Sequence, residues 1–254
     1  MSIRLACNVG SYGPDRNIAF EPLASIGCRN VEFHLPADDQ LDALEADLEK
    51  HGLTATTVMS DFPIHDEGIL SSFHRSIHAA NRFGAGVIFV SAHSKEVPLD
   101  VIYDRLRKLG DEAADHGVKI GIETHPDLAD NGRVARQTME AVNHPAVGIN
   151  FDTANVLFYA DGPSDTIEEL KKVLPWVVSV HLKDYSGTGP KQWAFPTLGK
   201  GHIDFPAVFR LLEAQGFDGP ATLEIEGVEG ETLTEAQMKE RVADSVRAAQ
   251  TAMG

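Results

Sequence analysis

Val118-Lys-Ile-Gly-Ile-Glu123 is the first of four short apolar runs that each end in a residue able to bind a metal ion. The other three runs are Val147-Gly-Ile-Asn-Phe-Asp152, Val177-Val-Ser-Val-His181 and Ala221-Thr-Leu-Glu224. Such runs are more apolar than a strand with one face in water, which favours parallel strands covered by helices. Three carboxylates and one imidazole at successive strand ends predict a site with three oxygen ligands and one nitrogen ligand.

Four earlier runs have the same character, and helical patterns alternate with the strands along the chain. These runs are Ile3–Asn8, Val31–His34, Thr54–Met59 and Gly86–Ser91. Helical segments stop at a glycine shortly before a strand at five places: Gly27, Gly52, Gly84, Gly117 and Gly216. Glycine just past a helix adopts the left-handed conformation that most residues avoid, so the repeated glycine marks helix ends.

Eight strand–helix units in 254 residues, without a linker or a break in composition, predict an α/β fold: a single (β/α)8 TIM barrel domain over residues 1–254. A doubly wound open sheet is the alternative. That fold more often has a glycine-rich phosphate-binding turn after its first strand, a pattern that Val9-Gly-Ser-Tyr-Gly13 fits poorly. The barrel is therefore the predicted fold.

Composition argues against several classes of partner. The chain has 43% hydrophobic and 24% charged residues, and its net charge of −16 opposes binding to nucleic-acid phosphates and to anionic membranes. Cys7 and Cys28 are too few cysteines for a disulfide framework. The first residues lack the long apolar stretch of a signal peptide or membrane helix. We therefore expect a cytoplasmic protein that binds neither nucleic acid nor membrane.

The four ligand candidates would meet at one face of the barrel. TIM-barrel active sites lie at the carboxyl ends of the strands, and neighbouring strands are about 4.8 Å apart. Three carboxylates at that spacing would raise the pKa of at least one of them unless a divalent cation lay between them. The set Glu123, Asp152, His181 and Glu224 suits Mn²⁺, Mg²⁺ or Co²⁺, and Zn²⁺ is possible. The alternative is that these residues only cap helices or form loop salt bridges.

A second layer of side chains is expected above these ligands, because residues two positions further along a strand have the same facing. It includes His125 and Lys183, which could bind substrate oxygens or could be exposed loop cations. It also includes Glu226, which competes with Glu224 for the ligand role. Glu224 is preferred because it lies nearer the apolar run.

Other polar residues near strand ends lie in the first half of the chain. They are Asn8, Glu32, His34, Asp61 and His93, of which Glu32 and His93 are the preferred substrate contacts. A polar residue at such a position otherwise supports a neighbouring side chain.

A long connection rich in glycine and proline, residues 184–205, follows the seventh predicted strand. Loops of this length without a helical pattern usually serve a site. Trp193 and Phe195 could cover a bound sugar ring or contact a second subunit of a homo-oligomer. Gly199-Lys-Gly-His202 could bind a phosphate. Further on, Thr234 and Gln237 have the spacing of a capping box and predict a closing helix to about Met253.

The ordered set of motifs resembles the xylose isomerase-like TIM-barrel superfamily, which includes D-tagatose 3-epimerase-like enzymes, inosose dehydratase and endonuclease IV. The motifs are Ile122-Glu123, Phe151-Asp152-Thr153, Val180-His181-Leu182-Lys183-Asp184 and Leu223-Glu224, together with Leu198-Gly-Lys-Gly-His-Ile-Asp-Phe205. The resemblance implies a Mn²⁺-type ion held by Glu123, Asp152, His181 and Glu224. In the epimerase branch the first and last glutamates also exchange the proton beside a carbonyl. Endonuclease IV has many more histidine ligands than this chain.

The expected function is therefore a metal-dependent sugar epimerase or isomerase acting beside the carbonyl of a ketose or keto-sugar, with Glu123 and Glu224 as the catalytic pair. The chain departs from the epimerase pattern at Asn155, an expected substrate contact, where those enzymes commonly have histidine. This departure keeps a second reaction open, a lyase or dehydratase acting on a keto-inositol or a 3-keto-glycoside. The non-enzymatic alternative is a sugar-binding barrel.

Overall fold

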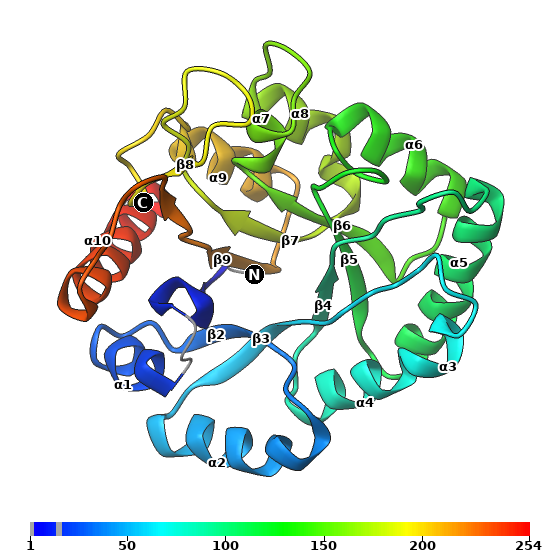
Figure 1. The fold of residues 1–254 in the computed structure, drawn as a ribbon, viewed down its shortest axis with the longest axis horizontal. Coiled ribbons are helices and arrows are strands. Elements are labelled where there is room, and N and C mark those ends of the chain that lie inside the picture. The colour runs from blue at the N-terminus through cyan, green and yellow to red at the C-terminus, as the bar shows by residue number, and fades with distance from the viewer. Residues whose placement is uncertain (1–2, 14–16) are drawn as a thin grey trace.

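Eight parallel strands close into a barrel in the computed structural model, which describes residues 3–13 and 17–254 (Figure 1). The barrel strands are β1 (Arg4–Asn8), β2 (Asn30–His34), β3 (Thr54–Met59), β4 (Val87–Val90), β5 (Lys119–Glu123), β6 (Val147–Asp152), β7 (Val177–Leu182) and β9 (Pro220–Leu223). They pair in chain order, and β9 returns to β1. Each strand coincides with a predicted run to within one residue at either end, so the predicted TIM barrel is confirmed.

Helices cover the outside of the barrel (Figure 1). They are α1 (Asn17–Ser25), α2 (Leu41–His51), α3 (Ile69–Ser72), α4 (His74–Arg82), α5 (Leu99–Asp115), α6 (Gly132–Val142), α7 (Asn155–Phe158), α8 (Thr166–Val173), α9 (Phe205–Ala214) and α10 (Glu235–Met253). Short 3-10 turns occur at η1 (Val9–Tyr12), η2 (Asp38–Gln40) and η3 (Leu174–Trp176). Among the residues described, no helix is both long enough and apolar enough to cross a membrane.

The residues predicted to mark the ends of helices are also found there. All five glycines that were expected to end helices have positive φ angles, between 62° at Gly52 and 78° at Gly216. A side chain at such a φ would be strained, which explains why glycine recurs there. At the start of α10, Thr234 and Gln237 form the reciprocal hydrogen bonds of a capping box.

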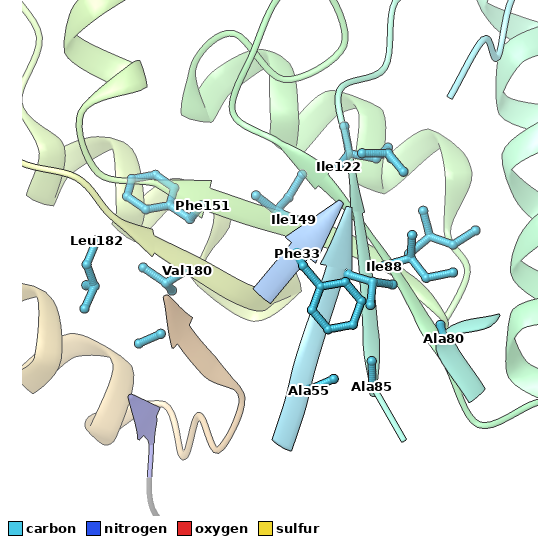
Figure 2. Packing of buried hydrophobic residues seen from close by; sticks show 14 of the residues in the cluster. Phe33, Ala55, Ala80, Ala85, Ile88, Ile122, Ile149, Phe151, Val180 and Leu182 are labelled. Carbon is cyan, nitrogen blue, oxygen red and sulfur yellow. The ribbon is translucent and has the colours of Figure 1, made fainter. Parts of the chain in front are cut away.

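Alternation along the strands separates the core from the site. Ile122, Phe151, Val180 and Leu182 belong to the large hydrophobic cluster between the strands and the helices, and Figure 2 shows them on neighbouring strands. Because successive side chains of a strand point to opposite faces, the residues between them point into the barrel. The apolar half of each run therefore anchors the helices, and the other half is free to carry polar groups.

The register of the strands brings the polar ends to a common level. Asp152 pairs directly with His181, whereas Glu123 pairs with Asn150 and His181 pairs with Thr222. Asp152 thus lies two residues beyond Asn150, the partner of Glu123. In the same way, Glu224 lies two residues beyond Thr222, the partner of His181. A step of two residues keeps the inward facing of the side chain, and the stagger compensates for the tilt of barrel strands.

A small antiparallel ribbon, which was not predicted, lies beside the barrel mouth. It pairs β8 (Ala194–Phe195), from the long connection after β7, with β10 (Gly227–Val228), just after β9. Two-residue strands have too little sequence to produce a recognisable pattern. The ribbon holds the connection beside the carboxyl end of β9, and this brings Trp193 to the mouth.

Candidate metal centre

The four predicted ligands converge at the carboxyl end of the barrel. One atom from each of Glu123, Asp152, His181 and Glu224 lies within 4.8 Å of the others. From His181 Nδ1, the distances to the nearest carboxylate oxygens are 3.5 Å to Glu123, 3.8 Å to Asp152 and 3.4 Å to Glu224. Glu226 lies outside this group, so the geometry favours Glu224 over Glu226 as the last member.

The other ring nitrogen of His181, Nε2, contacts a further carboxylate. Glu32, on β2, is fully buried and lies 3.1 Å from His181 Nε2. Its carboxylate also accepts a hydrogen bond from Asn8 Nδ2 at 2.8 Å. A carboxylate at Nε2 keeps a proton on that nitrogen, which turns Nδ1 and its lone pair towards the three carboxylates.

The ammonium group of Lys183 is buried beside the cluster. It lies 3.0 Å from Asp152 Oδ2, 2.5 Å from Glu224 Oε2 and 3.0 Å from Glu226 Oε2. It also lies 5.2 Å from the centroid of the Phe195 ring. Lys183 was predicted to lie in a layer above the ligands, and it does lie there, but its contacts are with the acidic groups themselves.

The buried charges shift one another's pKa values. Burial raises the pKa of Asp152 to about 6, against the lowering effect of Lys183. Burial acts to lower the pKa values of His181 and Lys183, but the surrounding carboxylates raise both well above their ordinary values. For Glu224, burial acts upward, but Lys183 and His181 outweigh it and the pKa falls. The two basic side chains, His181 and Lys183, thus lie among a larger number of carboxylates.

The donor set fits a divalent cation. Three buried atoms that face one another, Asp152 Oδ2, His181 Nδ1 and Glu224 Oε2, have no hydrogen-bond partner among the residues described. Lys183 forms ion pairs with the two oxygens, at 3.0 Å to Asp152 Oδ2 and 2.5 Å to Glu224 Oε2. Unpaired buried acceptors are costly, and a cation would satisfy all of them at once. Three oxygens and one nitrogen suit a hard or borderline divalent ion.

Neighbouring groups fix two of the carboxylates. Asp152 Oδ1 accepts hydrogen bonds from the backbone N–H groups of Ala154 and Asn155, both at 2.8 Å, so Oδ2 is the oxygen left facing the cluster. Ser91, just after β4, donates to Glu123 Oε2 at 2.6 Å. These contacts orient the two carboxylates within the folded chain.

A cavity of about 250 Å³ lies over the cluster. Its lining includes the two glutamates Glu123 and Glu224 and four of the predicted substrate contacts, namely His125, Asn155, Lys183 and Trp193. A larger cavity shares Met59, Trp193, Glu224 and Glu226 with it. Trp193 is 43% exposed and packs edge-on against Phe195 and Phe158, so it forms part of the rim.

Two predicted substrate contacts lie behind the lining instead. Among the described residues, neither Glu32 nor His93 belongs to the lining of these cavities. Glu32 supports His181, and the His93 ring packs edge-on against His125 with centroids 5.1 Å apart. Direct contact of Glu32 and His93 with a substrate therefore stays a prediction, and their contacts within the chain are with His181 and His125. Asn8 and His34 line the larger cavity, and Asp61 lies 3.4 Å from His34.

The prediction that Gly199-Lys-Gly-His202 binds a phosphate is wrong. The backbone N–H groups of Gly199 and Gly201 both donate to Asp184 Oδ2 at 2.8 Å, and Ile203 donates to the other oxygen. A buried carboxylate of the chain itself thus uses the amides that a phosphate would need. A Cβ on Gly201 would lie 2.2 Å from Asp184 Oδ1, which explains the glycine there.

Sequence reasoning missed two residues of the site. Ser91 lies at the last position of a predicted strand run, and that position was the only signal for its contact with Glu123. Tyr159, at the end of α7, places its hydroxyl 2.6 Å from His125 Nε2, while His125 Nδ1 lies 3.2 Å from the Pro126 carbonyl. Since a carbonyl only accepts, Nδ1 carries the proton and Nε2 accepts from Tyr159. No sequence pattern announces this pair.

Comparison with proteins of known sequence gives a consistent picture. A family model described as a xylose isomerase-like TIM barrel matches residues 20–248. An inosose dehydratase from Clostridium botulinum is 28% identical over 156 residues, which cover 53% of this chain and 49% of that protein. A ketose 3-epimerase from Arthrobacter globiformis is 24% identical over 218 residues, which cover 76% of this chain and 72% of that protein. The match thus spans about half the length of the dehydratase.

Among solved structures, a xylose isomerase-like TIM barrel protein from Mycobacterium smegmatis in complex with magnesium has a similar fold. The TM-score is 0.77 at 19% sequence identity, over 100% of this chain and 98% of that chain. At this identity the likeness shows the fold alone.

Proposed function

Because this chain belongs to the xylose isomerase-like TIM barrel family, we propose that it is a divalent-metal-dependent sugar epimerase or isomerase. The proposed reaction is proton transfer next to the carbonyl of a ketose or keto-sugar. The epimerase and the dehydratase among its relatives are both enzymes that act on carbonyl compounds of this kind. Mn²⁺ is the ion that we expect, held by Glu123, Asp152, His181 and Glu224.

The observation that carries the proposal is the arrangement of two glutamates around one imidazole. Glu123 and Glu224 both lie about 3.5 Å from His181 Nδ1, at 3.5 and 3.4 Å. They come from β5 and from the end of β9, with β6 and β7 between them in the barrel. The two carboxylates therefore approach a bound ligand from different sides, which suits removal of a proton on one face and return of a proton on the other.

The bound ion would polarise the substrate carbonyl and orient it, as a Lewis acid and template. Glu123 or Glu224 takes the proton from the carbon beside the carbonyl, and the other glutamate returns a proton to the opposite face. Lys183 supplies a buried ammonium that donates to a substrate oxygen and limits the repulsion among the carboxylates. Asn155 and the His125–Tyr159 pair offer hydrogen bonds to hydroxyl groups, and Trp193 excludes water from the mouth.

A second candidate is a lyase or dehydratase acting on a keto-inositol or a 3-keto-glycoside. Asn155 favours it, because this position departs from the histidine of the epimerase pattern, and an inosose dehydratase is among the relatives. Proton removal would be the same, and the Lys183–Glu226 pair, 3.0 Å apart, lies where it could protonate a departing hydroxyl group. The loss of that group would replace the return of the proton to carbon.

The test is incubation with Mn²⁺ and a panel of ketoses, keto-inositols and 3-keto-glycosides in D₂O. Epimerisation predicts deuterium at the carbon beside the carbonyl in a product of otherwise unchanged composition. Loss of water or of an aglycone would overturn the epimerase in favour of the lyase. Glu123→Gln and Glu224→Gln should each abolish exchange, whereas Glu213→Gln, an exposed change on α9, should not. Ligand binding without turnover or exchange in any assay would contradict an enzyme and leave a sugar-binding barrel.

A further inference from the structure

A second cluster of metal-binding side chains lies on the outside of the barrel, on the helices α4 and α5. Each helix carries two such residues four positions apart: His74 and His78 on α4, and Glu112 on α5 with His116 at its C-cap. Residues at this spacing lie on one face of a helix, one turn apart. The two helices are neighbours in the outer ring (Figure 1).

The side chains of these two faces meet. One atom from each of His74, His78 and Glu112 lies within 4.8 Å of the others, and His74 Nδ1 contacts Glu112 Oε1 directly. The ring of His78 lies between two others, with centroids 4.0 Å from His74 and 4.3 Å from His116. Three imidazoles and one carboxylate are therefore gathered at one place on the surface.

We propose that His74, His78, Glu112 and His116 form a second metal site, for a borderline divalent ion of the Zn²⁺ type. Three of the ligands already converge, and His116, whose ring centroid lies 4.3 Å from that of His78, is the proposed fourth. Three nitrogens and one oxygen make the tetrahedral set that Zn²⁺ and Co²⁺ accept in proteins. This second site is separate from the barrel mouth. Its proposal does not depend on the function proposed for the mouth.

The framework of this site is tied in place although its side chains reach water. Asn81 Nδ2, on α4, donates to the backbone carbonyl of His116 at 2.8 Å, and this hydrogen bond links the end of α5 to α4. His74 and His78 are exposed, while Glu112 and His116 are half-buried, which gives an ion free access from solvent. The bound ion would connect the two helices and so stabilise the folded chain.

Electrostatics also favour a cation here. Glu112 brings a carboxylate oxygen to the imidazoles of His74 and His78, and a cation is attracted to that group. The net charge of −16 raises the local concentration of cations around the whole protein.

The test uses Co²⁺ as a spectroscopic probe and Zn²⁺ in titration calorimetry, on the full chain. Tetrahedral coordination gives Co²⁺ intense visible absorption, whereas a six-coordinate ion in the mouth absorbs weakly. We expect the intense bands in the unaltered protein and in Asp152→Asn, and their loss in His78→Ala. His202→Ala removes an exposed imidazole elsewhere and serves as the matched control.

We further expect His78→Ala to weaken Zn²⁺ at this site by more than about 100-fold, because loss of a ligand costs more than loss of an outer partner. His78→Ala should keep the melting temperature of the metal-free protein while losing the rise that Zn²⁺ causes. Intense Co²⁺ bands that survive His78→Ala, or bands that are absent from every variant, would overturn the proposal. Loss of the bands in Asp152→Asn alone would overturn it too, because the tetrahedral ion would then lie in the mouth.

Discussion

The cluster at the barrel mouth and the cluster on α4 and α5 both combine imidazole and carboxylate groups, but they differ in setting. In the mouth, His181 and Asp152 are fully buried, and Lys183 and Glu32 pair with the members of the cluster. On the outside, His74 and His78 are exposed, and the partners of the cluster are one another. The mouth cluster also opens to a cavity that can hold a substrate.

The difference shows what would separate the proposed reaction centre from the proposed outer metal site. A buried carboxylate needs a compensating charge, so the mouth contains the Lys183 ammonium group, and its carboxylates are oriented in advance. Exposed ligands are balanced by water and salt, so they need no such support and retain side-chain freedom. Convergence of ligands is common to both clusters, but only the mouth adds orientation, low polarity around the charges and room for a second molecule.

The largest effect is expected from Asp152→Ala. We expect loss of the mouth ion and a fall in kcat/KM of at least about 100-fold, because a ligand is removed and an outer partner alone is worth 10- to 100-fold. Metal analysis and steady-state kinetics check this. Full activity in an Asp152→Ala protein that contains no mouth ion would contradict the proposed role of the ion.

Lys183→Met should be next in size. Removing one partner of a buried ion pair leaves uncompensated charge, and costs about 3–5 kcal/mol of unfolding free energy in the metal-free protein. Urea denaturation with and without Mn²⁺ measures the effect, and Mn²⁺ should recover part of the loss because it replaces the missing positive charge. Lys239→Met, which removes an exposed pair with Glu235 on α10, is the control and should cost less than about 1 kcal/mol.

Glu32→Gln tests the support of the imidazole. The amide can still occupy the same volume, but it no longer holds a proton on His181 Nε2 by charge. We expect the affinity of the mouth for Mn²⁺ to fall by about 10- to 100-fold, with the fold preserved. Unchanged Mn²⁺ affinity would remove Glu32 from the positioning role and make it a structural residue only.

The smallest effect on stability is expected outside the barrel. His78→Ala should change the unfolding free energy of the metal-free protein by no more than about 0.5 kcal/mol, as for other exposed positions. Thermal melts in the presence of a chelator measure this. A loss of unfolding free energy comparable with that of Lys183→Met would mean that the outer cluster contributes as much to stability as the mouth cluster does. The proposed difference between the two clusters would then be contradicted.

Local patterns predicted the strands and helices, and they predicted which polar side chains converge at the barrel mouth. Apolar runs such as Val147–Asp152 can be recognised in the sequence because alternation and burial act within a few residues. A glycine that ends a helix, such as Gly52, can be recognised because the requirement concerns only its own φ angle. The four strand ends were found in the same way. The α4–α5 cluster contains equally local spacings, but these become meaningful only when two helices are known to be neighbours.

The sequence by itself determined the barrel, the order of its strands and the identity of the inward-facing acids, because these follow from short-range periodicity. Only the tertiary structure decided that Glu32 lies behind His181 although 149 residues separate them, that Lys183 contacts the acids, and that Asp184 occupies the amides of the Gly199–Gly201 loop. The physical reason is that barrel closure and loop packing bring together side chains from distant strands. Their distances depend on register and stagger, which no single run of residues encodes.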